Sequence, residues 1–73
     1  GDNDMKLSAR NVLKGKVKSV ETGAVNSEVI LELPDGTEVV SIITNSSAKN
    51  LGLETGKEAY ALVKATNVML ATD

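Results

Sequence analysis

Residues 25–44 read V-N-S-E-V-I-L-E-L-P-D-G-T-E-V-V-S-I-I-T, a pattern that predicts two strands joined by a tight turn. From Val25 to Leu33 apolar and polar residues mostly alternate, as in a strand with one buried face. Pro34-Asp35-Gly36 suits a hairpin turn, because proline presets φ and glycine accepts a positive φ. The strand at about Thr37 to Thr44 is apolar on both faces, so we expect both faces to be covered, one of them by another subunit.

The same reading of the flanking sequence predicts three further strands and one short helix. The first strand is expected at about Leu7 to Val20, with lysines on one face and apolar residues on the other. Asn45 to Gly52 is expected to form the helix, with Asn45 or Ser46 as its N-cap and Gly52 just beyond its end. The last strands are expected at about Glu58 to Lys64 and Val68 to Thr72. This order predicts an all-β fold, a small five-stranded OB-like Greek-key barrel with one short helix.

Length and composition point to a single small domain that assembles as a homo-oligomer. The chain has 73 residues, no Cys and no His, and Tyr60 is its one aromatic residue. A core built from aliphatic side chains alone buries little area, which favours association between copies. Gly1–Asp4 is interpreted as a cloning remnant before a native start at Met5, so the domain is expected to span residues 5–73.

Charge and motif content exclude several classes of function. A net charge of −2 argues against nucleic acid and anionic lipid as partners, and no apolar run approaches the roughly 20 residues of a membrane span. The expected location is therefore the cytoplasm. The sequence has no nucleophile elbow, no phosphate-binding loop and no cluster of carboxylates at metal-ligand spacing, so we expect neither catalysis, nor an organic cofactor, nor a metal bound directly by side chains.

Two acid-free segments carry hydrogen-bond donors. Ser8-Ala9-Arg10-Asn11, followed by Lys14-Gly15-Lys16, combines a hydroxyl, a guanidinium, an amide and ammonium groups. Lys64-Ala65-Thr66-Asn67 forms a second such group at an expected strand break. A tetrahedral dianion accepts hydrogen bonds and donates none, so these groups suit it. The alternative is that the basic residues are solvated strand-edge residues and that Ser and Asn form turns.

A resemblance to a known family strengthens the anion hypothesis. Residues 8–17 read S-A-R-N-V-L-K-G-K-V and residues 21–29 read E-T-G-A-V-N-S-E-V. They resemble the S-A-R-N-x-x-x-G-x-V opening and the E-x-G-A-V-N-x-E-V stretch of the molbindins, the Mop-type molybdate-binding domains related to the TOBE domains of molybdate transporter ATPases and molybdate-responsive regulators. The similarity continues at residues 43–44 and the serines after them, 51–58 and 63–68, and so covers Met5 to Ala71.

The resemblance implies a five-stranded barrel that assembles as a hexamer, a trimer of dimers, and binds molybdate or tungstate between subunits. By motif, one site resembles Ser8, Ala9 and Arg10 of one subunit meeting Lys64, Ala65 and Thr66 of a neighbour. Thr66 stands where family members often have serine; the hydroxyl is kept, but the added methyl group can alter the fit. With no fusion partner present, the chain looks like a form that stores or buffers the oxyanion.

The resemblance also implies a second type of oxyanion site near a rotation axis. Its expected residues are Gly23, Ala24, Val25, Asn26, Ser27, Ser46 and Ser47. An ordinary hairpin turn is the alternative reading of residues 23–26. Two alternative functions also stay open: a regulatory or interaction module that senses the oxyanion, and an OB-like nucleic-acid-binding barrel. A nucleic-acid-binding barrel requires a basic groove with stacking aromatic residues, and a single tyrosine does not supply these.

Overall fold

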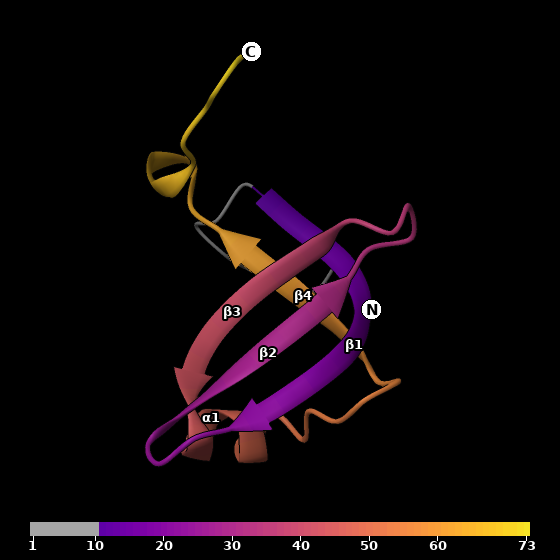
Figure 1. The fold of residues 1–73 in the computed structure, drawn as a ribbon, viewed down its shortest axis with the longest axis vertical. Coiled ribbons are helices and arrows are strands. Elements are labelled where there is room, and N and C mark those ends of the chain that lie inside the picture. Colours follow the sequence, from indigo (N-terminus) through magenta and orange to yellow (C-terminus); the bar gives the residue numbers. More distant parts are fainter. Residues whose placement is uncertain (1–10) are drawn as a thin grey trace.

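A computed structural model describes residues 11–73 and shows a curled antiparallel sheet with one short helix (Figure 1). In chain order the elements are β1 (Asn11–Thr22), β2 (Asn26–Glu32), β3 (Glu38–Thr44), α1 (Asn45–Asn50), β4 (Glu58–Val63) and the 3₁₀ helix η2 (Ala65–Asn67). The predictions made for Gly1–Asp4 and for Ser8, Ala9 and Arg10 lie outside the described residues.

The long strand β1 bends so that it pairs with two different neighbours. The sheet order is β3-β2-β1-β4, and Lys16 of β1 lies opposite both Glu32 of β2 and Glu58 of β4. An irregularity in the pairing between Val17 and Ser19 increases the local twist of the strand. Gly15 permits close approach at the bend, because a Cβ there would lie 2.5 Å from the Glu32 carbonyl oxygen. The bend curls the sheet around its inner face.

The core lies on that inner face and consists of aliphatic side chains. Val17, Val29 and Leu31 are buried and form its centre, and Leu53 from the segment after α1 packs against them. Along β1 the lysines at positions 14, 16 and 18 point outward while Gly15 and Val17 are buried. The predicted alternation is confirmed at Gly15 and Val17 of β1 and at Val29 and Leu31 of β2, whereas Leu13 and Val25, predicted to share these faces, are exposed.

The third strand confirms the two apolar faces but leaves one of them uncovered. Val39 and Ile43 are half-buried against the core. Val40 and Ile42 lie on the opposite face and are 58% and 60% exposed. The outer face of β3 is therefore apolar and exposed, which is typical of a protein interface.

The helix has the predicted position but a different N-cap. Thr44, in an extended conformation, is the cap, and its Oγ1 accepts a hydrogen bond of 3.1 Å from the Ser47 backbone N–H. The prediction of Asn45 or Ser46 was wrong because the Asn45 side chain is bonded to β2 and to the β1–β2 turn instead. Gly52 has a φ of 65° just after the helix, as predicted.

The fifth strand predicted at about Val68 to Thr72 is not a strand in this structure. After β4 the chain forms η2, with the Asn67 N–H donating to the Lys64 carbonyl at 2.9 Å, and then extends away from the sheet (Figure 1). A strand requires a neighbouring backbone to pair with, and this segment meets none within the described chain, so the sheet has four strands. Within residues 11–73, no helix is long and apolar enough to cross a membrane.

Candidate oxyanion site

The predicted donors at Lys64, Ala65 and Thr66 lie exposed where β4 ends. Lys64 precedes η2 in an extended conformation and makes no side-chain capping bond. Because the first N–H groups of a short helix have no acceptor within it, the N–H groups of Ala65 and Thr66 are directed out of η2. This exposed segment therefore carries two backbone amides, the Thr66 hydroxyl and the Lys64 ammonium group.

The beginning of the described part of β1 adjoins this segment. Asn11 lies opposite Val63 in the antiparallel pairing, and its side-chain Nδ2 donates to the Val63 carbonyl at 3.1 Å. The other half of the predicted site, Ser8, Ala9 and Arg10, lies outside the described residues. Lys64, Ala65 and Thr66 are thus placed together, at the end of the sheet where the described chain begins.

Residues 23–25 of the second predicted set form the turn between β1 and β2, and Asn26 is the first residue of β2. The Gly23 N–H donates to the Asn26 carbonyl at 2.8 Å, and a Cβ at Gly23 would lie only 2.8 Å from that same oxygen. Ala24 and Val25 at the tip of the turn are exposed, Val25 by 69%. This segment therefore forms a hairpin turn, the alternative reading given above, and the exposed tip of the turn is accessible to a ligand or a neighbouring copy.

Asn45 holds this turn against the start of α1, a role that the sequence analysis did not find. The buried Ser27 Oγ donates to Asn45 Oδ1 at 2.6 Å, and Asn45 Nδ2 donates to the Gly23 carbonyl at 2.9 Å. The Asn45 backbone N–H also donates to the Val25 carbonyl at 2.9 Å. Sequence reasoning considered Asn45 only as a helix cap, because the pairing of a residue with another 22 positions away leaves no local signal.

Hydroxyl groups gather beside this turn. Thr44 Oγ1 donates to Ser47 Oγ at 2.8 Å and lies 3.4 Å from Ser46 Oγ. Because Ser47 Oγ accepts in this pair, its own hydrogen can be donated to a ligand. Lys49 lines a hollow of about 310 Å³ together with Ser27 and Asn45 and adds a cation that the sequence analysis did not single out. The structure therefore links Gly23, Val25 and Ser27 of the second predicted set to Asn45, the residue that precedes Ser46 and Ser47.

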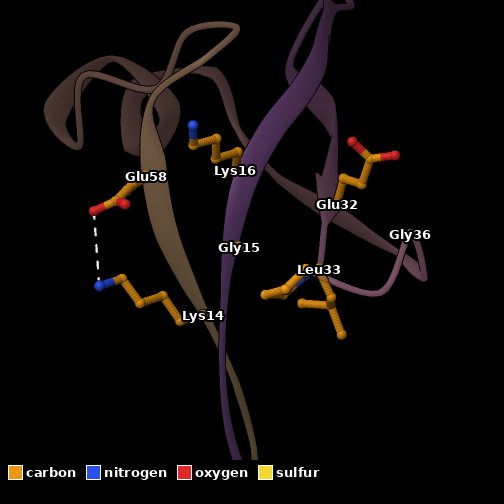
Figure 2. A pocket seen from close by; sticks show the side chains of 8 residues that line it. Lys14, Gly15, Lys16, Glu32, Leu33, Gly36 and Glu58 are labelled. Carbon is orange, nitrogen blue, oxygen red and sulfur yellow. Dashed lines mark ion pairs between the residues drawn. The ribbon is translucent and has the colours of Figure 1, made fainter.

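A larger hollow lies at the bend of β1 but does not suit a dianion. It has a volume of about 420 Å³ and is lined by Lys14, Lys16, Glu32 and Glu58 (Figure 2). The Lys14 Nζ lies 3.8 Å from Glu58 Oε1, so that lysine is already paired with a carboxylate. Two carboxylates at the rim would repel an oxyanion, and we assign no anion site here.

Ion pairing also removes Lys18 from the set of anion-binding candidates. Its ammonium group donates to the carboxylate of Glu38 on the neighbouring β3, and this hydrogen bond, with the attraction between the two charges, raises the pKa of Lys18 above 10.5. Among residues 11–73, no group of His, Cys, Asp or Glu side chains is arranged to hold a metal ion. Of the remaining lysines, Lys49 lines the hollow with Ser27 and Asn45, and Lys64 directly precedes η2.

Comparison with known proteins identifies relatives over nearly the whole chain. The family model described as TOBE domain matches residues 7–70. A protein of Haemophilus influenzae named "Probable molybdenum-pterin-binding protein" is 49% identical over 69 residues, which cover 94% of this chain and 100% of the relative.

Two solved structures share the fold. A molybdate-binding protein from Sporomusa ovata matches with a TM-score of 0.88 and 38% identity, over 93% of this chain and 100% of that one. The cytoplasmic molybdate-binding protein ModG, solved with molybdate bound, matches with a TM-score of 0.88 and 49% identity over 94% of this chain. The match spans 49% of the ModG chain, so the present chain corresponds to about half of that protein.

Proposed function

This chain belongs to the TOBE domain family, and from that premise we propose that it binds molybdate or tungstate between subunits, for storage or homeostasis in the cytoplasm and without catalysis. The observation that carries the proposal is full-length similarity to proteins that bind molybdate. The match to the Sporomusa ovata molybdate-binding protein covers 100% of that chain, so no part of it lacks a counterpart here.

The first proposed site consists of Ser8, Ala9 and Arg10 from one subunit and Lys64, Ala65 and Thr66 from a neighbour. The exposure of residues 64–66 and the outward N–H groups of η2 support it. Arg10 and Lys64 would balance the two negative charges, while the hydroxyls and amides fix the orientation of the oxygens. Hydrogen bonds to charged groups contribute about 1.5–3 kcal/mol each when water is excluded, which favours a site enclosed by two copies.

The second proposed site involves the β1–β2 turn and the first residues of β2, together residues 23–27, with Ser46 and Ser47. The bonds of Asn45 to Ser27 and Gly23 support it, because they fix the turn beside the hydroxyl groups. Asn45 is a positioning residue in this proposal, since both ends of its amide already have partners within the chain. Lys49 supplies the nearby positive charge.

The donor set predicts which oxyanions are rejected. Phosphate carries a proton near neutral pH, and a pocket that contains only donors offers that proton no acceptor. Sulfate also accepts hydrogen bonds only, so it must be excluded by the size of the cavity. Molybdate and tungstate have nearly the same size and charge, and we expect both to bind.

The name of the Haemophilus relative raises a second ligand, molybdenum carried by a pterin. A pterin ring is flat and is favoured by stacking on an aromatic side chain. Tyr60, on β4, is the single aromatic residue of the chain, and Lys14 already lies over its ring, 5.9 Å from the centroid. We therefore propose the inorganic oxyanion as the ligand.

Isothermal titration calorimetry tests this function. Molybdate and tungstate should bind, sulfate and phosphate should bind at least tenfold more weakly, and pterin should not compete. Arg10→Ala and Lys64→Ala should each weaken molybdate binding at the first site by about 10- to 100-fold, the equivalent of one lost charged hydrogen bond. Lys16→Ala, which removes the same charge at the bend of β1, is the matched control and should bind normally. Equal binding of molybdate and sulfate would contradict the proposal.

The oligomeric state is tested separately. We propose a hexamer arranged as a trimer of dimers, and native mass spectrometry of the intact protein should give six chains per particle. A particle that remains monomeric at the concentration of the calorimetry, yet binds molybdate, would contradict the placement of the sites between subunits.

A further inference from the structure

The segment that carries Lys64, Ala65 and Thr66 has few contacts with the rest of the described chain. Residues 64–67 are all exposed, and η2 lies beyond the end of β4, apart from the sheet (Figure 1). Among residues 11–73, η2 has no extensive packing against another helix or strand. The position of these donors therefore depends on Val63, the last residue of β4, to which Lys64 is joined.

Asn11 holds Val63 in two ways. The two residues lie opposite each other in the last β1–β4 pair on the η2 side of the described sheet, and terminal pairs open more readily than central ones. The half-buried Asn11 side chain also donates from Nδ2 to the Val63 carbonyl at 3.1 Å. Among residues 11–73, no other side-chain hydrogen bond reaches β4 or η2. The Asn11 side chain is thus an anchor at the point where the ladder ends.

We propose that Asn11 is the positioning residue of the first oxyanion site, an inference that rests on the function proposed above. Its bond to the Val63 carbonyl fixes where β4 ends and η2 begins. It thereby orients the amides of Ala65 and Thr66 and the start of the Lys64 side chain. A binding site must hold its groups within about 0.5 Å of the productive geometry, and an exposed segment without packing needs an anchor to do so.

The residue type at position 11 suits this role. The Val63 carbonyl accepts hydrogen bonds and donates none, so its partner must be a donor. A side-chain amide donates without adding a charge, whereas a carboxylate would repel both the carbonyl oxygen and an oxyanion. Asn11 also directly follows Arg10 in the sequence, while Lys64 directly follows Val63. The bond therefore lies between the two segments that one chain contributes to the proposed sites.

The anchor bears on the selectivity between molybdate and sulfate. Both ions accept hydrogen bonds and donate none, so the kind of donor does not separate them. Sulfate is the smaller ion, and donors held at a fixed spacing favour the larger one. Without the Asn11 bond, residues 64–66 can move inward and close on sulfate. The anchor should therefore favour molybdate over sulfate rather than strengthen the binding of every anion.

Calorimetry of two variants and a control tests this role. Asn11→Ala removes the side chain, and Asn11→Leu keeps its approximate size without the donor. Each should weaken molybdate binding at the first site by about tenfold and sulfate binding by no more than about threefold. Tyr60→Phe removes an uncharged polar group from the same strand as Val63 and is the matched control. It should keep both affinities, and native mass spectrometry should give the same oligomer for all four proteins.

NMR without any anion reads the anchor independently of binding. In the unaltered protein, nuclear Overhauser contacts should join the Asn11 side-chain amide hydrogens to Val63. The backbone amides of Ala65 and Thr66 should have order parameters of about 0.85, as in a rigid backbone. In Asn11→Ala these values should fall toward about 0.6, as in a flexible segment, while those of Tyr60→Phe stay unchanged.

Three results would overturn the role of Asn11. Unchanged selectivity in both variants, with molybdate still preferred by the unaltered protein, would mean that the site does not need the anchor. Equal weakening of molybdate and sulfate would mean a general loss of structure. Absence of the Overhauser contacts in the unaltered protein would remove the bond itself, even if neither variant folds. If the NMR results hold but the unaltered protein binds molybdate no better than sulfate, the proposed function fails while the anchoring of η2 by Asn11 stands.

Discussion

Replacing Asn45 by alanine should destabilise the domain far more than its surface position suggests. Asn45 is only partly buried, but its side chain is the link between the start of α1 and the β1–β2 turn. In Asn45→Ala, the Ser27 hydroxyl loses its acceptor and the Gly23 carbonyl loses a donor. The backbone bond from position 45 to the Val25 carbonyl can persist, so the change isolates the two side-chain bonds.

The expected loss follows from the different burial of these two partners. Ser27 is 1% exposed while Asn45 is in place, so its hydroxyl has little access to water, and an unsatisfied buried group costs about 1–3 kcal/mol. Gly23 is exposed, and water can replace the amide there, so that bond contributes only the net value of about 0.5–1.5 kcal/mol. Asn45→Ala should therefore lower the free energy of unfolding by about 2–4 kcal/mol.

A double-mutant cycle that combines Asn45→Ala with Ser27→Ala isolates the contribution of the Ser27–Asn45 hydrogen bond to the free energy of unfolding. Ser27→Ala leaves Asn45 Oδ1 accessible to solvent and should cost about 1 kcal/mol, the net value of one hydrogen bond. The double variant removes both partners, so it should be more stable than the sum of the single losses by about 1–2 kcal/mol. Urea unfolding at one fixed chain concentration measures all four proteins, because the stability of an oligomer depends on concentration.

Additive losses in this cycle would refute the reasoning, since they would mean that Ser27 and Asn45 do not depend on each other. A loss below about 0.5 kcal/mol for Asn45→Ala, within the range of ordinary surface substitutions, would refute the assigned role of the link itself. The Thr44→Ala variant, which removes the helix cap instead, is a useful comparison and should cost about 1 kcal/mol without coupling to Ser27.

Three further changes test other parts of the fold. Gly15→Ala should lower the free energy of unfolding, measured by urea titration, by about 1–3 kcal/mol. The added Cβ would lie 2.5 Å from the Glu32 carbonyl oxygen, so β1 and β2 would have to separate. Unchanged stability would contradict the close approach of the two strands. Val17→Ala, at a position 1% exposed, should cost about 1.5–3 kcal/mol, and a smaller loss would mean that the core collapses into the space. The Thr37 N–H donates to the Asp35 carboxylate and holds the pKa of Asp35 below 3.8. The charged carboxylate should therefore stabilise the fold above pH 3.8, and this stabilisation should be lost as the pH falls through the pKa of the folded state. Asp35→Asn should remove this pH dependence, and NMR titration of Asp35 should give a pKa below 3.8.

Strand alternation made most of the local fold predictable. The period of two in β1 separated outward lysines from the inward Gly15 and Val17, and Pro34-Asp35-Gly36 placed the β2–β3 turn, where Gly36 has a φ of 91°. Gly52 marked the end of α1 in the same local way. Strand alternation, turns and helix ends depend on the backbone preferences of residues that are close in the sequence, so the sequence of this chain alone predicts them.

The bend in β1 and the Asn45 link were not predictable in this way. Nothing local shows that Lys16 faces both Glu32 and Glu58, because that geometry depends on where two distant strands pair with the same residue. Asn45 was expected to cap its own helix, and tertiary bonds to Gly23 and Ser27 took its side chain instead. Residues of the candidate sites came from motif resemblance, while Lys49 could be found only from its place beside Ser27.

The missing fifth strand has a physical origin that also bears on function. The alternation of apolar residues at Val68–Thr72 predicts a segment that can pair with a β-sheet. The alternation does not indicate whether that sheet belongs to the same chain or to another. In residues 11–73, four hydrophobic residues are buried while eleven large ones are exposed, and Val40, Ile42, Met69 and Leu70 are among the latter. Exposed apolar side chains in this proportion favour the association with a second copy that is proposed above. In the proposed assembly, contacts that cover the apolar edges would also bring Lys64 and Thr66 to a neighbouring chain, so assembly and anion binding would be coupled. Dilution below the dissociation constant of the oligomer should therefore abolish molybdate binding at the first site, and added molybdate should hold the oligomer together.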